Sequence, residues 1–306
     1  MTQAALVIDN LKKIYASGTE ALKGVSLTVP AGDFFGLLGP NGAGKTTVLG
    51  IVTGLVNKTA GTVSVFGCDI DKEPEKAKAH IGLVGQEINF NPFEKPFDIV
   101  VNQAGYYGIP RSVAIPRAKK LLVDLGLGDK MTQKAMTLSG GMKRRLMIAR
   151  ALVHQPRFLI LDEPTAGVDV ELRRGMWEYL RALTKEGLTI LLTTHYLEEA
   201  EQLCRHIAII NKGQIISNGS MKDILKKLKS ETISIDLTQP VTSNALDALR
   251  AYGPKKVDDT TIEIEIGAGR GLHDAIMILD QHHLAVQSVR NKSGKLEEVF
   301  VKLINE

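Results

Sequence analysis

Gly39-Pro40-Asn41-Gly42-Ala43-Gly44-Lys45-Thr46-Thr47 is the stretch that decides the fold, because it fits the pattern G-x-x-x-x-G-K-[ST]. The run before it, Phe34 to Leu38, is short and apolar, as a buried parallel strand should be. The run after it, Val48 to Val52, supplies the inner face of a helix, and Gly54 suits the C-terminus of that helix. The sequence therefore predicts a strand, a tight loop and a helix in that order.

The residue types in this loop suit a nucleoside triphosphate. Glycines let backbone amides turn toward phosphate oxygens, and the N-terminus of the following helix adds positive potential. Lys45 would add a mobile ammonium group, and Thr46 would offer its hydroxyl to Mg²⁺. We interpret residues 39–47 as a phosphate-binding loop rather than as a glycine-rich turn that contains Lys-Thr by chance.

Length and composition favour one large core with a smaller appendage. The chain has 306 residues, of which 44% are hydrophobic. No apolar run approaches the roughly 20 residues that span a bilayer, and the N-terminus lacks a basic segment followed by an apolar one. The sequence therefore predicts a soluble chain that stays in the compartment where it is made.

Cysteine usage and charge narrow the class further. Cys68 and Cys204 lie far apart and form no C-x-x-C pair, so reduced thiols and the cytosol are expected. The net charge of +4 is small for this length. The basic runs Lys143-Arg144-Arg145 and Lys222 to Lys229 are interpreted as solvated helix faces, so no nucleic-acid partner is expected.

Three further apolar runs end in polar residues. Gln86 follows Ile81 to Gly85, the pair Asp162-Glu163 follows Phe158 to Leu161, and His195 follows Leu188 to Thr194. Open α/β sheets bind their ligands at the carboxyl ends of such strands. The sequence therefore predicts that these side chains share one edge of the sheet.

Each of these side chains has a candidate role. Asp162 fits the shell of a Mg²⁺ ion, and Glu163 fits the residue that polarises an attacking water. Gln86 would contact the ion or the water through its amide oxygen, and His195 would contact a γ-phosphate. A loop glutamine and a structural histidine are the alternatives when either residue is taken alone.

The segment Leu138-Ser139-Gly140-Gly141-Met142 opens another helix, with Ser139 as its N-cap. Two glycines in the first turn cost about 1 kcal/mol each inside a helix, so helix initiation alone does not explain them. Bare amides at a helix N-terminus suit an anion that must come close. Ser139-Gly140-Gly141 is therefore a second candidate for phosphate contact.

The domain prediction is a main domain over residues 1–220 and a small α/β domain over residues 221–306. Within the first, residues 88–155 read as a helical insert. The second has a predicted β-α-β-α-β-α order and contains no motif that carries chemistry. Five aromatic side chains of the insert would form either a partner-docking surface or internal packing: Phe90, Phe93, Phe97, Tyr106 and Tyr107.

The order of these signals resembles that of the ATP-binding subunit of an ATP-binding cassette (ABC) transporter. The resemblance covers roughly residues 5–220. It implies that Tyr15, which by its own properties would either stack on a base or pack on the sheet edge, stacks on adenine. It also implies that Gln86 forms the Q-loop, Ser139 to Gly141 the signature, Gly167-Val168-Asp169 the D-loop, and His195 the switch histidine. Met142 and Thr47 depart from the commonest residues of the family but remove no group needed for hydrolysis.

The resemblance also implies how the protein works. The fold class would be a P-loop α/β ATPase with a helical subdomain and a small C-terminal α/β domain, using ATP and Mg²⁺. Two copies would pair as a homodimer that sandwiches ATP between the P-loop of one and the signature of the other. The pair would act at the cytoplasmic face of the membrane as a peripheral motor for separate membrane-spanning permease subunits, most similar to bacterial drug and polysaccharide exporters.

Three alternatives remain open on the sequence. One is an import ATPase whose C-terminal domain is regulatory. Another is a soluble cassette ATPase that acts on nucleic acid or ribosomes, although this chain has neither a second cassette nor a long coiled-coil insert. The third is a binding module that does not hydrolyse ATP, which the presence of Lys45, Asp162 and Glu163 disfavours.

Overall fold

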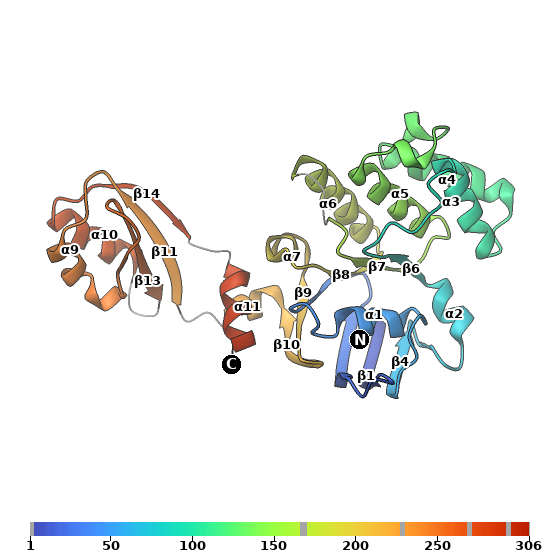
Figure 1. Ribbon diagram of the computed structural model, residues 1–306, viewed down its shortest axis with the longest axis horizontal. Helices are drawn as coiled ribbons and strands as arrows, with labels where there is room; N and C mark the ends of the chain where they lie inside the picture. Colours follow the sequence, from blue (N-terminus) through green and yellow to red (C-terminus); the bar gives the residue numbers. More distant parts are fainter. Residues whose placement is uncertain (1–2, 166–169, 227–229, 268–270, 292–294, 306) are drawn as a thin grey trace. The chain divides into compact units, whose positions relative to one another are not determined.

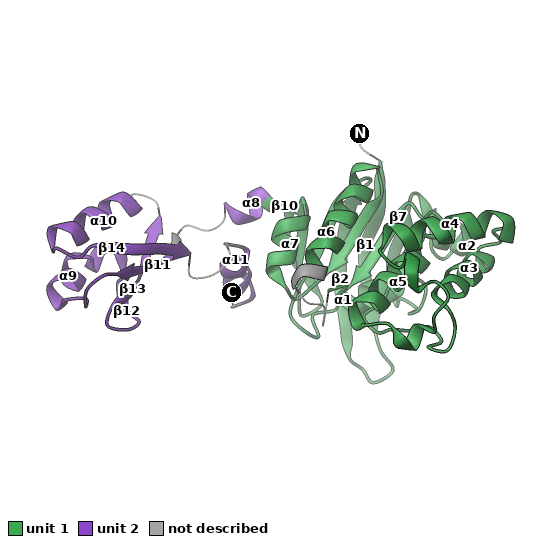
Figure 2. Cartoon of the chain, turned by 90° about the horizontal axis from the view of Figure 1, so that it is seen from above, with its two compact units in different colours: residues 1–221 green, residues 222–306 purple. Residues whose placement is uncertain are grey.

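The computed structural model describes residues 3–165, 170–226, 230–267, 271–291 and 295–305. The chain divides into two compact units, Met1–Met221 and Lys222–Glu306 (Figure 2). In these described ranges, no helix combines the length and the apolar character needed to cross a membrane. Cys68 and Cys204 are both free thiols, as predicted.

A six-stranded sheet forms the centre of the first unit (Figure 1). Its order is β10-β9-β3-β8-β7-β6, and all neighbours pair in parallel except β10 with β9. Every residue of β3 and β8 is buried, which explains their continuous apolar character. The strands are β3 (Phe34–Leu38), β6 (Ile81–Val84), β7 (Phe158–Asp162), β8 (Thr189–Thr193), β9 (His206–Asn211) and β10 (Gln214–Ser220).

A second, antiparallel sheet has the order β2-β1-β4-β5. One buried cluster joins this sheet to the helix that follows the phosphate-binding loop, α1 (Lys45–Val52), and to β3. Helix α1 is therefore fixed on both sides, and so is the loop at its N-terminus. The strands are β1 (Ala4–Ile14), β2 (Glu20–Pro30), β4 (Ala60–Val65) and β5 (Cys68–Asp69).

A group of helices follows β6 and leads back to β7 (Figure 1). Helix α4 begins at Arg111 and contains Pro116. The helices of the first unit beyond α1 are α2 (Pro74–Ala79), α3 (Pro96–Tyr106), α4 (Arg111–Asp124), α5 (Gly140–Leu152), α6 (Val170–Lys185) and α7 (Leu197–Leu203), with short 3₁₀ turns at Gly128–Lys130 and Ala135–Thr137.

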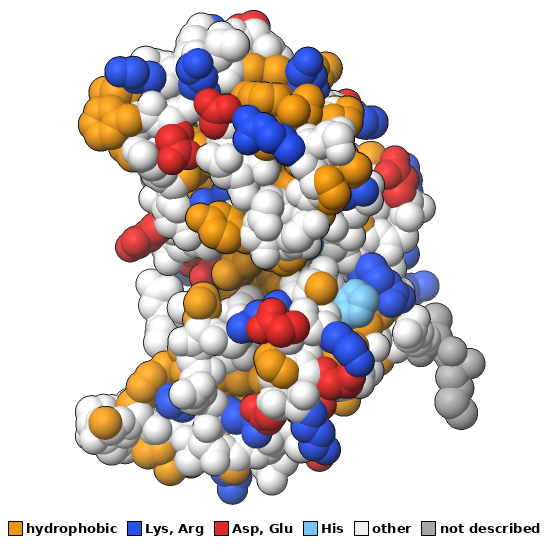
Figure 3. Space-filling view, turned by 90° about the vertical axis from the view of Figure 1, so that its right-hand side faces the viewer, with side chains coloured by type: hydrophobic (Ala, Val, Ile, Leu, Met, Phe, Trp, Pro, Cys, Tyr) orange, Lys and Arg blue, Asp and Glu red, His pale blue; other side chains and the backbone are white. Residues whose placement is uncertain are grey.

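The aromatic side chains of this helical group do not form one packed cluster. Phe93 and Tyr106 are 66% and 86% exposed. Tyr107 instead stacks on the ring of His154, with centroids 3.6 Å apart. Figure 3, which faces the right-hand side of Figure 1, shows hydrophobic side chains interspersed with charged ones.

The second unit is built on an antiparallel sheet of order β12-β13-β11-β14. Its elements follow the predicted order with one short strand, β12, added, which gives the β-α-β-β-α-β pattern of a split βαβ fold. Helix α8 ends at Leu225, and residues 227–229 lie outside the described part. The elements are α8 (Met221–Leu225), β11 (Ser230–Leu237), α9 (Ser243–Ala248), a 3₁₀ turn (Arg250–Tyr252), β12 (Lys255–Lys256), β13 (Thr261–Gly267), α10 (Leu272–Gln281), β14 (Val286–Asn291) and α11 (Lys295–Asn305).

The contact between β6 and α5 gives a test of the packing around the site. A Cβ atom on Gly82 would lie 2.5 Å from the backbone oxygen of Ala151 and 3.0 Å from the Pro156 ring. Gly82→Ala should therefore lower the free energy of unfolding by about 1–3 kcal/mol, measured by denaturant titration. Gly105→Ala is the matched control, since a Cβ there meets nothing within 4 Å in a helix, and it should stabilise by up to about 1 kcal/mol. Equal effects of the two substitutions would contradict this packing.

Candidate functional site

The loop of residues 39–44 is shaped by its glycines. A Cβ on Gly39 would lie 2.3 Å from the backbone oxygen of Ile210, so only glycine fits against β9 there. Gly44 has φ +114° and forms the N-cap of α1 without a side-chain cap. Gly42, at φ +78°, has open space where a side chain would stand. The loop therefore leaves its backbone accessible beside the uncapped N-terminus of a helix, which suits an anion.

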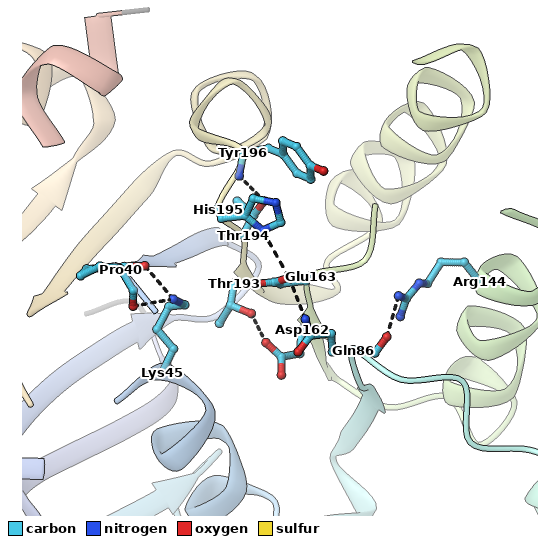
Figure 4. Close-up of polar contacts among 11 residues, drawn as sticks. Pro40, Lys45, Gln86, Arg144, Asp162, Glu163, Thr193, Thr194, His195 and Tyr196 are labelled. Carbon is cyan, nitrogen blue, oxygen red and sulfur yellow. Dashed lines mark hydrogen bonds and ion pairs between the residues drawn. The ribbon is translucent and has the colours of Figure 1, made fainter. Parts of the chain in front are cut away.

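Lys45 is held inside this loop. Its Nζ donates to the backbone oxygens of Gly39 at 2.6 Å and Pro40 at 3.1 Å (Figure 4). The side chain is buried, and burial lowers the pKa of Lys45, while the negative charges of Glu163 and Asp162 oppose that shift. The ammonium group thus lies between the loop and the two carboxylates, where a bound phosphate oxygen would meet it.

Thr193, at the end of β8, bonds both to Asp162, the last residue of β7, and to Glu163, which follows that strand. Its hydroxyl donates to Oδ1 of Asp162, and its backbone oxygen accepts from the backbone N–H of Glu163 at 2.9 Å. Glu163 has φ +49°, a left-handed conformation that costs a non-glycine residue about 1–3 kcal/mol. A strained backbone conformation persists only where the surrounding structure holds it in place, and such residues cluster at functional sites.

The side chain of Glu163 contacts the side chains of Gln86, which follows β6, and of His195, which follows β8. Its Oε2 accepts from Nε2 of Gln86 at 3.0 Å and lies 3.2 Å from Nδ1 of His195 (Figure 4). The Glu163 side chain is 12% exposed and that of His195 is 46% exposed. The structure thus brings the predicted Gln86, Asp162, Glu163 and His195 to one edge of the sheet, next to the loop that holds Lys45.

A cavity of about 390 Å³ is bordered by Lys45, Gln86, Asp162 and Glu163, whereas His195 does not line it. Its size is within the usual range of small-molecule sites, and its walls are polar residues from both the loop and the sheet edge. The residues that line it are Ala21, Asn41, Gly42, Gly44, Lys45, Thr46, Thr47, Gln86, Asp162 and Glu163.

Other predicted residues lie outside this cavity. The Tyr15 hydroxyl is 3.2 Å from Oγ1 of Thr47, and the Lys13 ammonium lies 4.8 Å from the centre of the Tyr15 ring. Ser139 caps α5 as predicted, accepting from the backbone N–H of Met142 at 3.3 Å. Ser139 and Gly140 are exposed, so α5 presents an open N-terminus. The D-loop prediction, residues 167–169, lies outside the described residues.

The prediction that Lys143-Arg144-Arg145 is a solvated helix face is wrong for Arg144, which is 5% exposed. Nη1 of Arg145 also donates to the backbone oxygen of Leu125, at 2.9 Å. Two backbone carbonyls accept from the Arg144 guanidinium, and this permits its burial, whereas Arg145 is only partly buried and its Nε has no hydrogen-bond partner. Thr193 was also missed, because a threonine at the end of an apolar strand gives no signal that distinguishes it from strand packing.

The fold and the site together define a class of protein. A glycine-rich loop joins a parallel strand to a helix and holds a lysine, and adjacent strands end in two carboxylates, a glutamine and a histidine. This arrangement is that of a P-loop nucleoside triphosphatase.

Comparison with known proteins gives the family. Residues 22–166 match the model described as ABC transporter. The linearmycin resistance ATP-binding protein LnrL of Bacillus subtilis (strain 168) is 37% identical over 97% of this chain and 97% of its own length. The Nod factor export ATP-binding protein I of Paraburkholderia xenovorans (strain LB400) is 40% identical over 99% and 98%. The chain therefore belongs to the ABC transporter family and is an ATPase that binds ATP.

Solved structures agree with this assignment. A dimeric ATP-binding cassette in a post-hydrolysis state bound to ADP and Pi is 26% identical, with a TM-score of 0.65. That similarity covers 71% of this chain and 98% of the other. The predicted α/β fold class and the predicted ABC family are confirmed.

The burial of Lys45 gives a test of the nucleotide site. Lys45→Met keeps the length of the side chain but removes the charge that the phosphates would meet, so ATP affinity measured by calorimetry should fall about tenfold or more. Lys45→Met also removes the hydrogen bonds to the Gly39 and Pro40 backbone oxygens, so the fold of the variant is checked by circular dichroism before binding is measured. A variant that binds ATP as tightly as the parent would contradict this position for the phosphates.

Proposed function

We propose that this chain is the ATP-hydrolysing motor subunit of a membrane exporter and that it works as a homodimer. The observation that carries the proposal is the Glu163 carboxylate, held between Gln86 and His195 beside the loop that contains Lys45. A carboxylate placed in this way can polarise a water for in-line attack on a γ-phosphate. The water would be the nucleophile, and the Glu163 carboxylate would accept its proton.

The chain's other residues would hold the phosphates and their charge. Lys45 and the amides of residues 42–47 would neutralise charge on the β- and γ-phosphates. His195 would contact the γ-phosphate from the far side of Glu163. Tyr15, beside Thr47, would stack on the adenine ring.

Mg²⁺ fits the oxygen groups around the cavity. The Thr46 hydroxyl, the Asp162 carboxylate and the Gln86 amide oxygen are hard ligands of the kind that Mg²⁺ prefers. Among the residues that the structure describes, no three His, Cys, Asp or Glu side chains could hold a metal ion by themselves. We therefore propose that the ion is bound jointly with phosphate oxygens of ATP, where it would supply charge neutralisation.

The exposed N-terminus of α5 supports pairing between two copies. Ser139 and Gly140 lie outside the cavity of their own chain, yet both are exposed at the N-terminus of α5, the end of a helix that suits a phosphate. A second copy would present this signature to the γ-phosphate held by the first. The solved cassette named above is dimeric with ADP and Pi, which supports the same arrangement here.

The exporter assignment rests on the relatives. One is named for resistance to linearmycin and another for Nod factor export, and both align with nearly the whole of this chain, including its second unit. We propose that the chain acts at the cytoplasmic face of the membrane as a peripheral subunit and drives separate permease subunits. The proposed domains are residues 1–220 for ATP hydrolysis and residues 221–306 for a role outside catalysis.

Glu163→Gln tests the proposed chemistry. The amide cannot accept a proton from water, so the kcat for Mg-ATP hydrolysis should fall by about 10²–10⁴. ATP affinity should change little, because the cavity keeps its shape. Glu198→Gln is the matched control, since Glu198 is exposed in the first turn of α7 and does not line the cavity. Parental hydrolysis rates in both variants would contradict the role of Glu163.

A further inference from the structure

Arg144, in the second turn of α5, donates two hydrogen bonds to the backbone of the loop that carries Gln86. Its Nη2 donates to the backbone oxygen of Gln86 at 2.7 Å (Figure 4). Its Nη1 donates to the backbone oxygen of Gly85 at 2.6 Å. The planar guanidinium group suits two consecutive carbonyls, because its donors form a rigid fork. These two bonds fix the chain directly after the end of β6.

The position of that loop determines where the Gln86 side chain lies. From the backbone that Arg144 holds, Nε2 of Gln86 reaches Oε2 of Glu163 at 3.0 Å. A continuous series of hydrogen bonds therefore joins Arg144 of α5, Gln86 and the Glu163 carboxylate. No direct hydrogen bond or ion pair joins the described residues Arg144 and Glu163, and Gln86 is hydrogen-bonded to both of them.

The burial of Arg144 is costly for packing alone. Burial lowers the pKa of Arg144, and the negative charges of Asp162 and Glu163 oppose that shift. An apolar side chain of similar volume would fill the space between α5 and β6 without the desolvation of a charge. The guanidinium group is therefore best explained by the two carbonyls that it orders.

We propose that Arg144 is a positioning residue for ATP hydrolysis: it acts through the backbone of Gln86 to hold Glu163 in place. Arg144 and the exposed Ser139 belong to the same helix, α5. This inference rests on the proposed function, in which Ser139 meets the nucleotide of a second copy.

Two other arginines of α5 show what is particular to Arg144. Arg145 donates to the backbone oxygen of Leu125, within the helical group, and among the described residues no hydrogen bond or ion pair joins it to the site. Arg150 donates to the backbone oxygen of Asn89 at 3.1 Å, farther along the loop. Arg145 lies on the same helix as Arg144 and also donates to a backbone carbonyl. Arg145→Met therefore removes a comparable guanidinium group that has no hydrogen bond to Gln86.

A double-mutant cycle tests the inference. The kcat and KM for Mg-ATP are measured for the parent, Arg144→Met, Gln86→Ala and the double variant. Arg144→Met should lower kcat about tenfold or more with little change in KM, since the defect is one of position. In the Gln86→Ala background the same substitution should change kcat by less than about twofold, because the group through which it acts is already absent. Arg145→Met should change kcat by the same factor in the parent and in the Gln86→Ala background.

Arg144→Lys separates position from charge. Lysine keeps the positive charge near Asp162 and Glu163 but cannot form the two-pronged contact, so its kcat should stay well below that of the parent. If Arg144→Met does not fold, the cycle is run with Arg144→Lys, and the same loss of effect in the Gln86→Ala background is expected.

Two results would overturn the inference. One is an equal reduction of kcat by Arg144→Met with and without the Gln86 side chain, and the other is a parental kcat in Arg144→Lys. A parent protein that hydrolyses no ATP would instead overturn the proposed function, so the two failures are distinguishable.

Discussion

Parallel pairing of β6, β7 and β8 is the constraint on which the site depends. Val84 is level with Leu161, and Asp162 is level with Thr193, so the chain leaves all three strands at the same edge. Gln86, Glu163 and His195 follow within two residues of these positions, and their side chains converge on one carboxylate. A shift of one residue in either pairing would turn these side chains away from each other. The buried, apolar strands that fix this register thus determine the chemistry at their ends.

The same edge gathers two adjacent carboxylates, which repel each other unless positive groups or donors surround them. The structure supplies donors from several directions. Thr193 donates to Asp162, Gln86 donates to Glu163, and the charges of Lys45 and Arg144 interact favourably with both carboxylates. The left-handed backbone of Glu163 is held by a hydrogen bond from its N–H to the backbone oxygen of Thr193, on the neighbouring strand β8.

Short-range patterns in the sequence were enough to predict the strand, loop and helix around Lys45, the strands that end at Gln86, Asp162 and His195, and the cap at Ser139. Apolar runs and glycines report such local geometry directly. The burial of Arg144 could not be predicted, because its partners are the carbonyls of residues 85 and 86, far away in the chain, and a basic run on a helix is usually solvated. Which strand lies beside β7, and hence the role of Thr193, is likewise a property of the assembled sheet.

The central claim is that one chain holds the nucleotide and the signature of a second chain completes the site. Mixing Ser139→Arg protein with Glu163→Gln protein tests it, because neither variant alone should hydrolyse ATP. A mixed pair contains one complete site, made of Glu163 from the first variant and Ser139 from the second. Equal mixing should restore about a quarter of the parental hydrolysis rate, since half of the pairs are mixed and each has one intact site. A mixture that stays as inactive as its two components would contradict the account.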